Sequence, residues 1–269
     1  MDLQLNDQVA VITGGISGIG WATAQLFLAE GCRVAIWDRT EKNDQQDPPD
    51  NIASESRLRF YVADVTDEAS LTLARQQTLE DFGRVDHLVH AAAIGSGKFG
   101  FPFSNLTPTD WQRVLQVNIV GMVNVVHCLA SQFEQQKSGT MTFIGSIAGQ
   151  IGSQTDPPYS ASKAANINFM QCLAKDFAKH HVRANIVNPG MVKTPLNRSV
   201  WQSWHDQQPL DQRLSYEAWA EAKIKSIIPL GRWQTAEDIA NIVVFLASHR
   251  AANITGQCIN VDGGCVMHA

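Results

Sequence analysis

Short apolar runs alternate with longer amphipathic stretches along most of this chain. Runs of about five residues rich in valine, isoleucine and alanine are typical of strands buried on both faces of a sheet. The expected strands are residues 8–13, 33–37, 58–63, 85–90, 140–145, 182–188 and 257–261. The expected helices run from the first glycine-rich turn to Gly31 and over residues 67–82, 109–136, 157–181 and 235–248. This alternation predicts an α/β fold with a parallel sheet covered by helices on both faces.

Two segments interrupt the alternation. Residues 40–57 are polar, contain Pro48-Pro49, and predict a surface loop. Residues 191–228 hold three tryptophans among polar side chains, which favours a lid over a substrate pocket. We find no internal repeat or linker, so we expect one domain over residues 1–269 with the lid at about 191–228.

Composition narrows the range of partners. The chain has 269 residues, a net charge of -5, 44% hydrophobic and 17% charged residues, and no basic run. These values are those of a soluble globular protein and argue against nucleic-acid or membrane binding, which leaves a small molecule or another copy of the chain as partner. The five widely spaced cysteines form no C-x-x-C pattern, so we expect no disulfide framework and no metal site. Together with an N-terminus unlike a signal peptide, they predict a cytoplasmic protein.

A glycine-rich turn follows the first expected strand. Gly14, Gly18 and Gly20 let the backbone turn tightly and approach a pyrophosphate, which then lies at the positive end of the following helix. Taken alone, the turn could also be an ordinary strand-to-helix connection. Because it opens the first βα unit, it favours a Rossmann-like, doubly wound parallel sheet in a single dinucleotide-binding and catalytic domain.

The second expected strand ends at Asp38, 18 residues beyond Gly20. An acid at this place accepts hydrogen bonds from the adenosine ribose and repels a 2′-phosphate, so it favours NAD over NADP. Arg39 could instead bind a 2′-phosphate or be a solvated surface residue. The cofactor prediction is therefore NAD, with this alternative open.

Candidate chemistry lies between Ser146 and Lys163. Tyr159 and Lys163 are four residues apart, so on a helix they share one face, where an ammonium group would favour the phenolate. Ser146 follows the strand 140–145, at the edge where an α/β protein usually presents its chemistry. A tyrosine and a lysine at this spacing also occur by chance, so the prediction depends on the rest of the chain.

Taken together, the motifs closely resemble those of the short-chain dehydrogenase/reductase family across essentially the whole chain. They are Thr13-Gly14-x-x-x-Gly18-x-Gly20, Asp64, Asn118, Ser146, Tyr159-x-x-x-Lys163, Pro189-Gly190 with Thr194, and Val261-Asp262-Gly263-Gly264. The resemblance implies that Tyr159 is the catalytic acid or base, that Lys163 lowers its pKa and holds the nicotinamide ribose, that Ser146 binds the reacting oxygen, and that Asn118 anchors a proton-relay water.

The resemblance also implies a set of cofactor-binding residues. They are Gly14, Ser17, Gly18, Ile19, Gly20, Asp38, Arg39, Asp64, Val65, Ala92, Tyr159, Lys163, Pro189, Val192 and Thr194. One departure from the family pattern is clear, because this chain has His90-Ala91-Ala92-Ala93 where the family usually has Asn-Asn-Ala-Gly. The change affects packing near the adenine and leaves the reacting groups in place.

Substrate clues come from polar side chains near the expected pocket. Ser96, Lys98, Gln150 and Arg198 are the predicted substrate residues, since polar groups beside tryptophans suit a sugar-like molecule and a cation could pair with its carboxylate. For each residue singly, an ordinary surface side chain remains the alternative. Residues 92–100 and 150–156 are similar to segments of bacterial sugar-acid dehydrogenases of the 2-keto-3-deoxy-L-fuconate 4-dehydrogenase type.

The leading hypothesis is therefore NAD-dependent oxidation of a secondary hydroxyl on a small polyhydroxylated acid. An NADPH-dependent 3-oxoacyl reductase and a non-catalytic NAD-binding sensor are the alternatives. The family resemblance further implies a homotetramer built on the apolar faces of residues 109–136 and 157–181, and the tail at 265–269 is expected to approach a neighbouring subunit.

Overall fold

The computed structural model describes residues 2–41, 56–153 and 155–267. Seven parallel strands form one sheet with the order β3-β2-β1-β4-β5-β6-β7. The strands are β1 (Val9–Thr13), β2 (Arg33–Asp38), β3 (Leu58–Val62), β4 (His87–His90), β5 (Gly139–Ile144), β6 (Val182–Pro189) and β7 (Cys258–Val261). All seven expected strands are confirmed, with ends within about two residues of the predicted ones. The predicted surface loop at 40–57 falls mostly outside the described residues.

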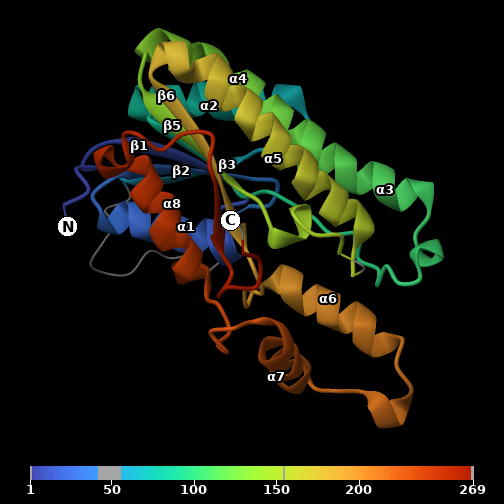
Figure 1. Ribbon diagram of the computed structural model, residues 1–269. Coiled ribbons are helices and arrows are strands. Elements are labelled where there is room, and N and C mark those ends of the chain that lie inside the picture. The colour runs from blue at the N-terminus through green and yellow to red at the C-terminus, as the bar shows by residue number, and fades with distance from the viewer. Residues whose placement is uncertain (1, 42–55, 154, 268–269) are drawn as a thin grey trace.

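Helices cover both faces of the sheet (Figure 1). One face carries α1 (Gly18–Ala29) and α8 (Ala236–Ala247), and the other carries α2 (Glu68–Phe82), α3 (Pro108–Leu115), α4 (Gly121–Gln136) and α5 (Pro157–Phe177). The order of the strands reverses between β1 and β4, as in a doubly wound fold. The predicted single-domain, Rossmann-like architecture is confirmed.

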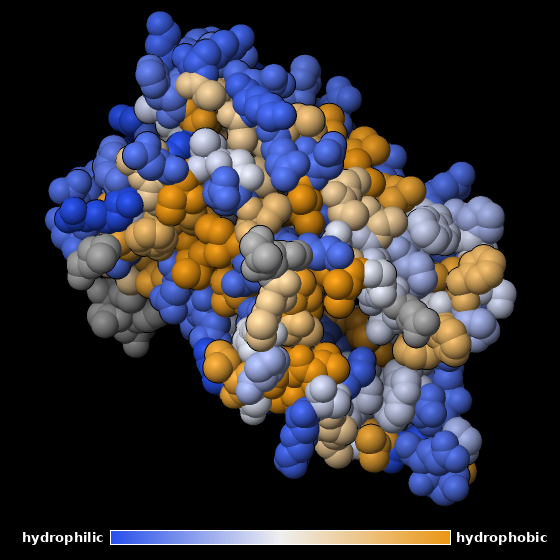
Figure 2. Space-filling view, viewed as in Figure 1, coloured by the Kyte–Doolittle hydropathy of each residue, from blue (hydrophilic) through white to orange (hydrophobic). Residues whose placement is uncertain are grey.

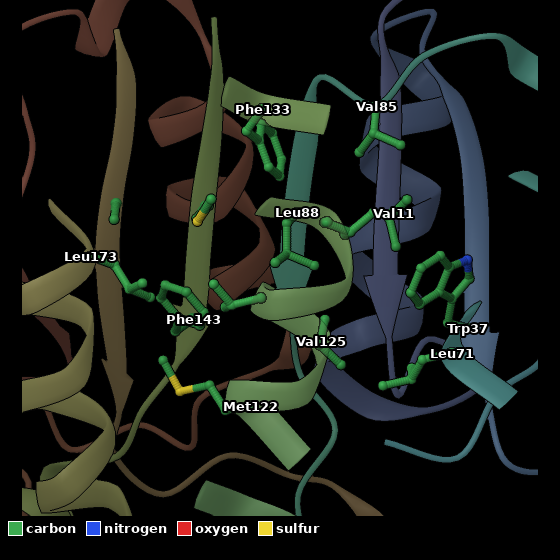
Figure 3. Close-up of a cluster of buried hydrophobic side chains, with 14 of the residues drawn as sticks. Val11, Trp37, Leu71, Val85, Leu88, Met122, Val125, Phe133, Phe143 and Leu173 are labelled. Atoms are coloured by element: carbon green, nitrogen blue, oxygen red, sulfur yellow. The ribbon is translucent and has the colours of Figure 1, made fainter. Parts of the chain in front are cut away.

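Each face of the sheet buries its own apolar cluster. Figure 3 shows the larger one, in which Trp37 of β2 lies near Leu71 of α2, and Phe143 of β5 lies near Met122 of α4. The indole N–H of Trp37 donates to Thr78 Oγ1 at 3.0 Å, so the largest buried side chain leaves no polar group without a partner. These clusters fix the carboxyl ends of the strands, where the site lies.

The expected helix at 109–136 is divided in the structure. A π-helical segment, Gln116–Val120, lies between α3 and α4 and contains the fully buried Asn118. Such wide turns are often found at functional sites. The whole stretch Pro108–Gln136 has the length and apolar composition of a membrane span, yet it packs on the sheet through Met122, Leu129 and Phe133, as the core helix of an α/β domain does.

The predicted lid forms two helices beyond the carboxyl end of the sheet, α6 (Pro195–Asp206) and α7 (Tyr216–Ile227). They hold a third apolar cluster, in which Tyr216 and Trp219 are buried and Trp201, Trp204 and Trp233 pack around them. Figure 2 shows polar and apolar side chains mixed on the outer surface of this end, where Leu210 and Ile227 are exposed, and further apolar side chains over α8. The tryptophans of this segment pack in the cluster around Tyr216.

Candidate active site

A cavity of about 700 Å³ opens along the carboxyl ends of β1, β2, β4, β5 and β6, with α6 on its far side. All fifteen residues predicted to bind the cofactor line this cavity. Their individual roles remain predictions, but the fold brings them to one continuous surface. The surface runs from Asp38 at one end to Tyr159 at the other.

The glycine-rich turn forms a cradle that fits a pyrophosphate. Gly14 has a φ of +66°, and a Cβ there would lie 2.8 Å from Ala92 Cα. A Cβ on Gly20 would lie 2.2 Å from the Gly14 carbonyl oxygen. Ser17 precedes α1 without making a side-chain cap, so the first N–H groups of the helix stay available to an anion. The chain therefore presents backbone donors and no side chain where a phosphate would lie.

Asp38 and Asp64 line the adenosine end of the cavity. The Asp38 carboxylate accepts hydrogen bonds from Thr40 N at 3.3 Å and Thr40 Oγ1 at 3.1 Å, which hold it at the end of β2. The pKa of Asp64 lies below its ordinary value because its carboxylate accepts from Thr66 N and Thr66 Oγ1. Arg39 is exposed beside them and also lines the cavity. Asp38, which favours NAD, and Arg39, which could bind the 2′-phosphate of NADP, therefore both lie at this end of the cavity.

Tyr159 and Lys163 lie on one face of α5, which begins beside the cavity. Asp156 caps this helix by accepting from Tyr159 N at 3.5 Å, and prolines occupy its first turn. The Lys163 Nζ lies 5.4 Å from the centre of the Tyr159 ring and donates to Ile144 O at 2.7 Å. The Ser146 hydroxyl is hydrogen-bonded to the Tyr159 phenol and accepts from Ala148 N at 3.1 Å. Three of the four predicted catalytic groups are thus adjacent.

The pKa of Tyr159 contradicts the expected lowering by Lys163. Burial raises the pKa of Tyr159 to about 12, the hydrogen bond from Ser146 opposes this rise, and the charge of Asp156 adds to it. Burial also lowers the pKa of Lys163 to about 8. The reason is geometric, because the ammonium points to the Ile144 carbonyl and not to the phenol oxygen. In this structure Tyr159 is therefore a protonated acid at neutral pH.

Asn118 lies behind the cavity wall and does not line it. Its side chain accepts from Ile94 N and donates to Ile94 O, both at 2.9 Å, and donates to Ser162 Oγ at 2.9 Å. The Ser162 hydroxyl in turn donates to Tyr159 O at 2.7 Å. Asn118 thus joins the loop after β4 to α5, and its role in holding a relay water stays a prediction.

Of the four predicted substrate residues, only Lys98 lines the cavity. The expectation that the other three face it is wrong, because neighbours hold their side chains elsewhere. Ser96 is buried and its hydroxyl donates to Lys98 O at 3.1 Å. Gln150 pairs with Asn260, with both hydrogen bonds at 2.9 Å. Arg198 lies over the Tyr216 ring at 4.9 Å.

Most of the substrate end is lined by side chains that the sequence did not single out. They are Ile94, Phe99, Ser153, Thr155, Leu196, Ser199, Val200 and Ser203. The members from α6 recur every three or four residues, which is the spacing of one helix face. That periodicity could have identified the inner face of the lid once a helix at 195–206 was predicted.

A family model described as enoyl-(acyl carrier protein) reductase matches residues 14–266. The chain is 30% identical to the 3-oxoacyl-[acyl-carrier-protein] reductase FabG of Thermotoga maritima over 98% of this chain and 100% of that protein. It is 34% identical to an uncharacterised short-chain type dehydrogenase/reductase of Sinorhizobium fredii over 98% and 99% of the two chains.

Among solved structures, a levodione reductase superposes with a TM-score of 0.86 at 27% identity, covering 96% of this chain and 97% of that one. The sheet order, the glycine cradle and the Ser146–Tyr159–Lys163 cluster agree with these matches. The chain therefore belongs to the short-chain dehydrogenase/reductase family and is a nicotinamide-dependent oxidoreductase.

Proposed function

We propose that this enzyme uses NAD to oxidise a secondary hydroxyl of a small polyhydroxylated acid of the 2-keto-3-deoxy-L-fuconate type, or to reduce the corresponding ketone. The observation that carries the proposal is the lining of the substrate end of the cavity. Ser153, Thr155, Asn197, Ser199 and Ser203 bring hydroxyl and amide groups to it. Such groups can pair with the hydroxyls of a polyol. Asn197 and Ser199 also have partners within the protein, because Asn197 accepts from the Tyr216 hydroxyl and Ser199 donates to Leu196 O, both at 2.8 Å.

A bound nicotinamide would exchange a hydride with the carbon of the substrate that carries the reacting oxygen. Tyr159 takes or gives the proton of that oxygen, and Ser146 holds it by a hydrogen bond. Lys163 keeps a positive charge within 5.4 Å of the Tyr159 ring centre. The residues of this chain therefore supply positioning and proton transfer, and the cofactor supplies the redox chemistry.

The preference for NAD is supported by Asp38. Its carboxylate lies in the cavity lining at the end of β2 and accepts from Ile16 N at 3.4 Å, on the glycine-rich turn. A 2′-phosphate at this place would meet a negative charge. A substrate carboxylate would meet Lys98, which reaches the cavity and pairs with Asp110 at 2.8 Å.

An NADPH-dependent 3-oxoacyl reductase is the second candidate. The 30% identity to a 3-oxoacyl-[acyl-carrier-protein] reductase favours it, and so does Arg39, an exposed cation in the cavity lining that a 2′-phosphate could reach. The two candidates differ in both cofactor and substrate, so they can be separated by kinetics.

The test is a matrix of initial rates. NAD and NADP at matched concentrations are combined with aldonic acids, 2-keto-3-deoxy acids, neutral polyols and 3-hydroxyacyl thioesters. We expect NAD with an acid polyol to give the highest kcat/KM, and Lys98→Ala to raise KM for acids but not for neutral polyols. A preference for NADP with thioesters would support the second candidate. Cofactor binding without turnover of any substrate would support a sensor.

A homotetramer and a cytoplasmic location remain part of the proposal. Val120 and Val123 are 39% and 40% exposed on the outer side of the stretch 109–136, and Figure 2 shows apolar side chains over α8. A tetramer with D2 symmetry needs more than one self-complementary surface, and these regions offer two. Light scattering of the purified protein is expected to give about four times the mass of the chain, and a monomer would contradict it.

A further inference from the structure

Three side-chain amides form a partly buried hydrogen-bond network beside Ser146. Gln150 lies in the loop after β5, at the end of the 3-10 helix Ile147–Gly149, whereas Asn188 lies on β6 and Asn260 on the neighbouring β7. Asn188 is fully buried and the other two are half-buried. None of the three lines the cavity, and none has a part in the proton transfer described above.

Asn260 is the centre of this network. Its amide nitrogen donates to Gln150 Oε1 at 2.9 Å and to Val266 O at 3.1 Å. Its carbonyl oxygen accepts from Gln150 Nε2 at 2.9 Å and from Asn188 Nδ2 at 3.3 Å. An asparagine side chain has two donors and two acceptor sites, so every hydrogen-bonding position of Asn260 is used.

Asn188 connects Asn260 to the loop of residues 146–150. Its side-chain oxygen accepts from the backbone N–H of Ser146 at 3.2 Å. The fit is close, because a Cβ added to Gly145 would lie 2.0 Å from that oxygen. Glycine at 145 is therefore the residue that lets Asn188 reach the serine. Gln150 ties the far end of the same loop to Asn260, so both ends of residues 146–150 depend on one side chain.

The C-terminal segment folds back so that Val266 contacts Asn260. The buried Asp262 accepts from Gly264 N at 2.9 Å and from Val266 N at 2.7 Å, which folds the chain back after β7. This turn directs the Val266 carbonyl to the amide of Asn260. A continuous series of hydrogen bonds thus runs from Val266 through Asn260 and Asn188 to the backbone of Ser146.

We propose that Asn260 is a positioning residue that couples the docked C-terminal segment, residues 264–267, to Ser146, and so sets where the Ser146 hydroxyl meets Tyr159. Buried amide networks fix geometry well when every member is satisfied, and removing one member leaves the others without partners. Release of the segment would free one donor of Asn260, loosen Gln150 and Asn188, and shift the serine. The expected effect on turnover rests on the proposed function, whereas the coupling between the C-terminal segment and Ser146 does not.

The coupling is tested by hydrogen exchange in the protein without substrate. Asn260→Ala is expected to speed exchange of a peptide covering 145–151 by roughly tenfold, the factor that corresponds to about 1.4 kcal/mol of local opening. Gln257→Ala, an exposed amide on the approach to the same strand, is the matched control and should leave that peptide unchanged. Unchanged exchange in Asn260→Ala would overturn the proposal whatever the substrate proves to be.

The action through Ser146 is tested by a double-mutant cycle on kcat with the best substrate found. Asn260→Ala should lower kcat at least tenfold with little change in the KM for the cofactor, and should lose that effect in a Ser146→Ala background. An equal loss in both backgrounds would contradict the proposal. If Asn260→Ala does not fold, truncation after Cys265 removes Val266, with both the carbonyl that accepts from Asn260 and the N–H that donates to Asp262. Truncation after Met267 keeps both groups and is the control; equal exchange in the two would also overturn the coupling.

Discussion

Desolvation opposes the charged form of both Tyr159 and Lys163. The pKa of Tyr159 is raised to about 12 and that of Lys163 is lowered to about 8, in each case chiefly by burial. A phenol that holds its proton is a good donor to a carbonyl oxygen and a poor base toward an alcohol. At the scale of single residues, we therefore expect reduction to be favoured near neutral pH and oxidation at alkaline pH.

Removal of the Tyr159 hydroxyl tests its place in the reaction. Tyr159→Phe is expected to lower kcat by roughly 10²–10⁴-fold, the usual contribution of a positioned acid or base. Cofactor affinity, measured by tryptophan fluorescence, should change little because Lys163 and the glycine cradle are intact. Tyr61→Phe is the matched control, since Tyr61 donates to Asp81 from β3 and is not part of the cavity lining. Wild-type turnover in Tyr159→Phe would exclude the assigned chemistry.

The pH profile of kcat/KM tests the direction of the Tyr159 pKa. Below its pKa, the fraction of phenolate rises tenfold for each pH unit, so oxidation should accelerate above pH 7. The rise should become shallower above about pH 8, where Lys163 loses its positive charge. Reduction should stay nearly constant over the same range, because the phenol remains protonated. A plateau for oxidation beginning below pH 8 would mean that the phenol ionises near neutrality and that burial is not the dominant effect.

The residues predicted from the sequence to bind the cofactor all line the cavity, whereas three of the four predicted substrate residues do not. The cofactor end of the cavity depends on backbone geometry, because a Cβ at Gly14 or Gly20 would collide with neighbouring backbone atoms. The substrate end depends on the direction in which each side chain points. Gln150 and Arg198 are polar and near the cavity, but Asn260 and the Tyr216 ring hold them away from it, and these partners are distant in sequence.

At the scale of elements, the interrupted helix α3–α4 was not visible in the hydrophobic pattern. Apolar positions continue through Gln116–Val120, so the pattern predicts one helix. The wide turn is stabilised by long-range contacts, in which Asn118 bonds both polar groups of the Ile94 backbone. Strands were easier to predict, because burial on both faces makes each of them a continuous apolar run.

The segment predicted to be a lid has its own small apolar core, and a change at Trp219 tests whether that core unfolds independently of the sheet. Trp219 is 4% exposed and lies near Tyr216, with ring centres 6.3 Å apart, and under the Lys223 ammonium at 4.4 Å. Trp219→Ala should loosen α6 and α7 by an amount on the order of 3 kcal/mol and leave the sheet intact.

Hydrogen exchange would then increase over residues 195–227 but not over β1 or β5, and the KM for substrate should rise more than the KM for cofactor. Leu210→Ala removes a side chain that is 82% exposed in the same segment and should change neither quantity. Loss of protection throughout the sheet would show that the lid and the domain unfold together.

At the scale of the whole molecule, two buried histidines link stability to pH. The two ring nitrogens of His87 lie 2.8 Å from Thr140 Oγ1 and 2.7 Å from Gln8 Oε1, and the Nδ1 of His90 lies 2.9 Å from Thr13 Oγ1. Burial lowers the pKa of His87 to about 4 and that of His90 to about 3. Both therefore stay neutral in the folded protein at pH values where they are protonated in the unfolded chain.

The free energy of unfolding should consequently fall in mild acid. A histidine whose folded pKa lies below its unfolded value of about 6.5 stabilises the fold fully above that pH, and loses about 1.4 kcal/mol per pH unit below it. From pH 7 to pH 5 we expect a loss of about 2 kcal/mol for each of the two, measured by urea unfolding. The double variant His87→Gln, His90→Asn should lose less between these pH values, and His127→Gln, an exposed control, should behave as the wild type. An equal loss in the double variant would assign the acid sensitivity to carboxylates instead, because their protonation is the other common cause of unfolding in acid.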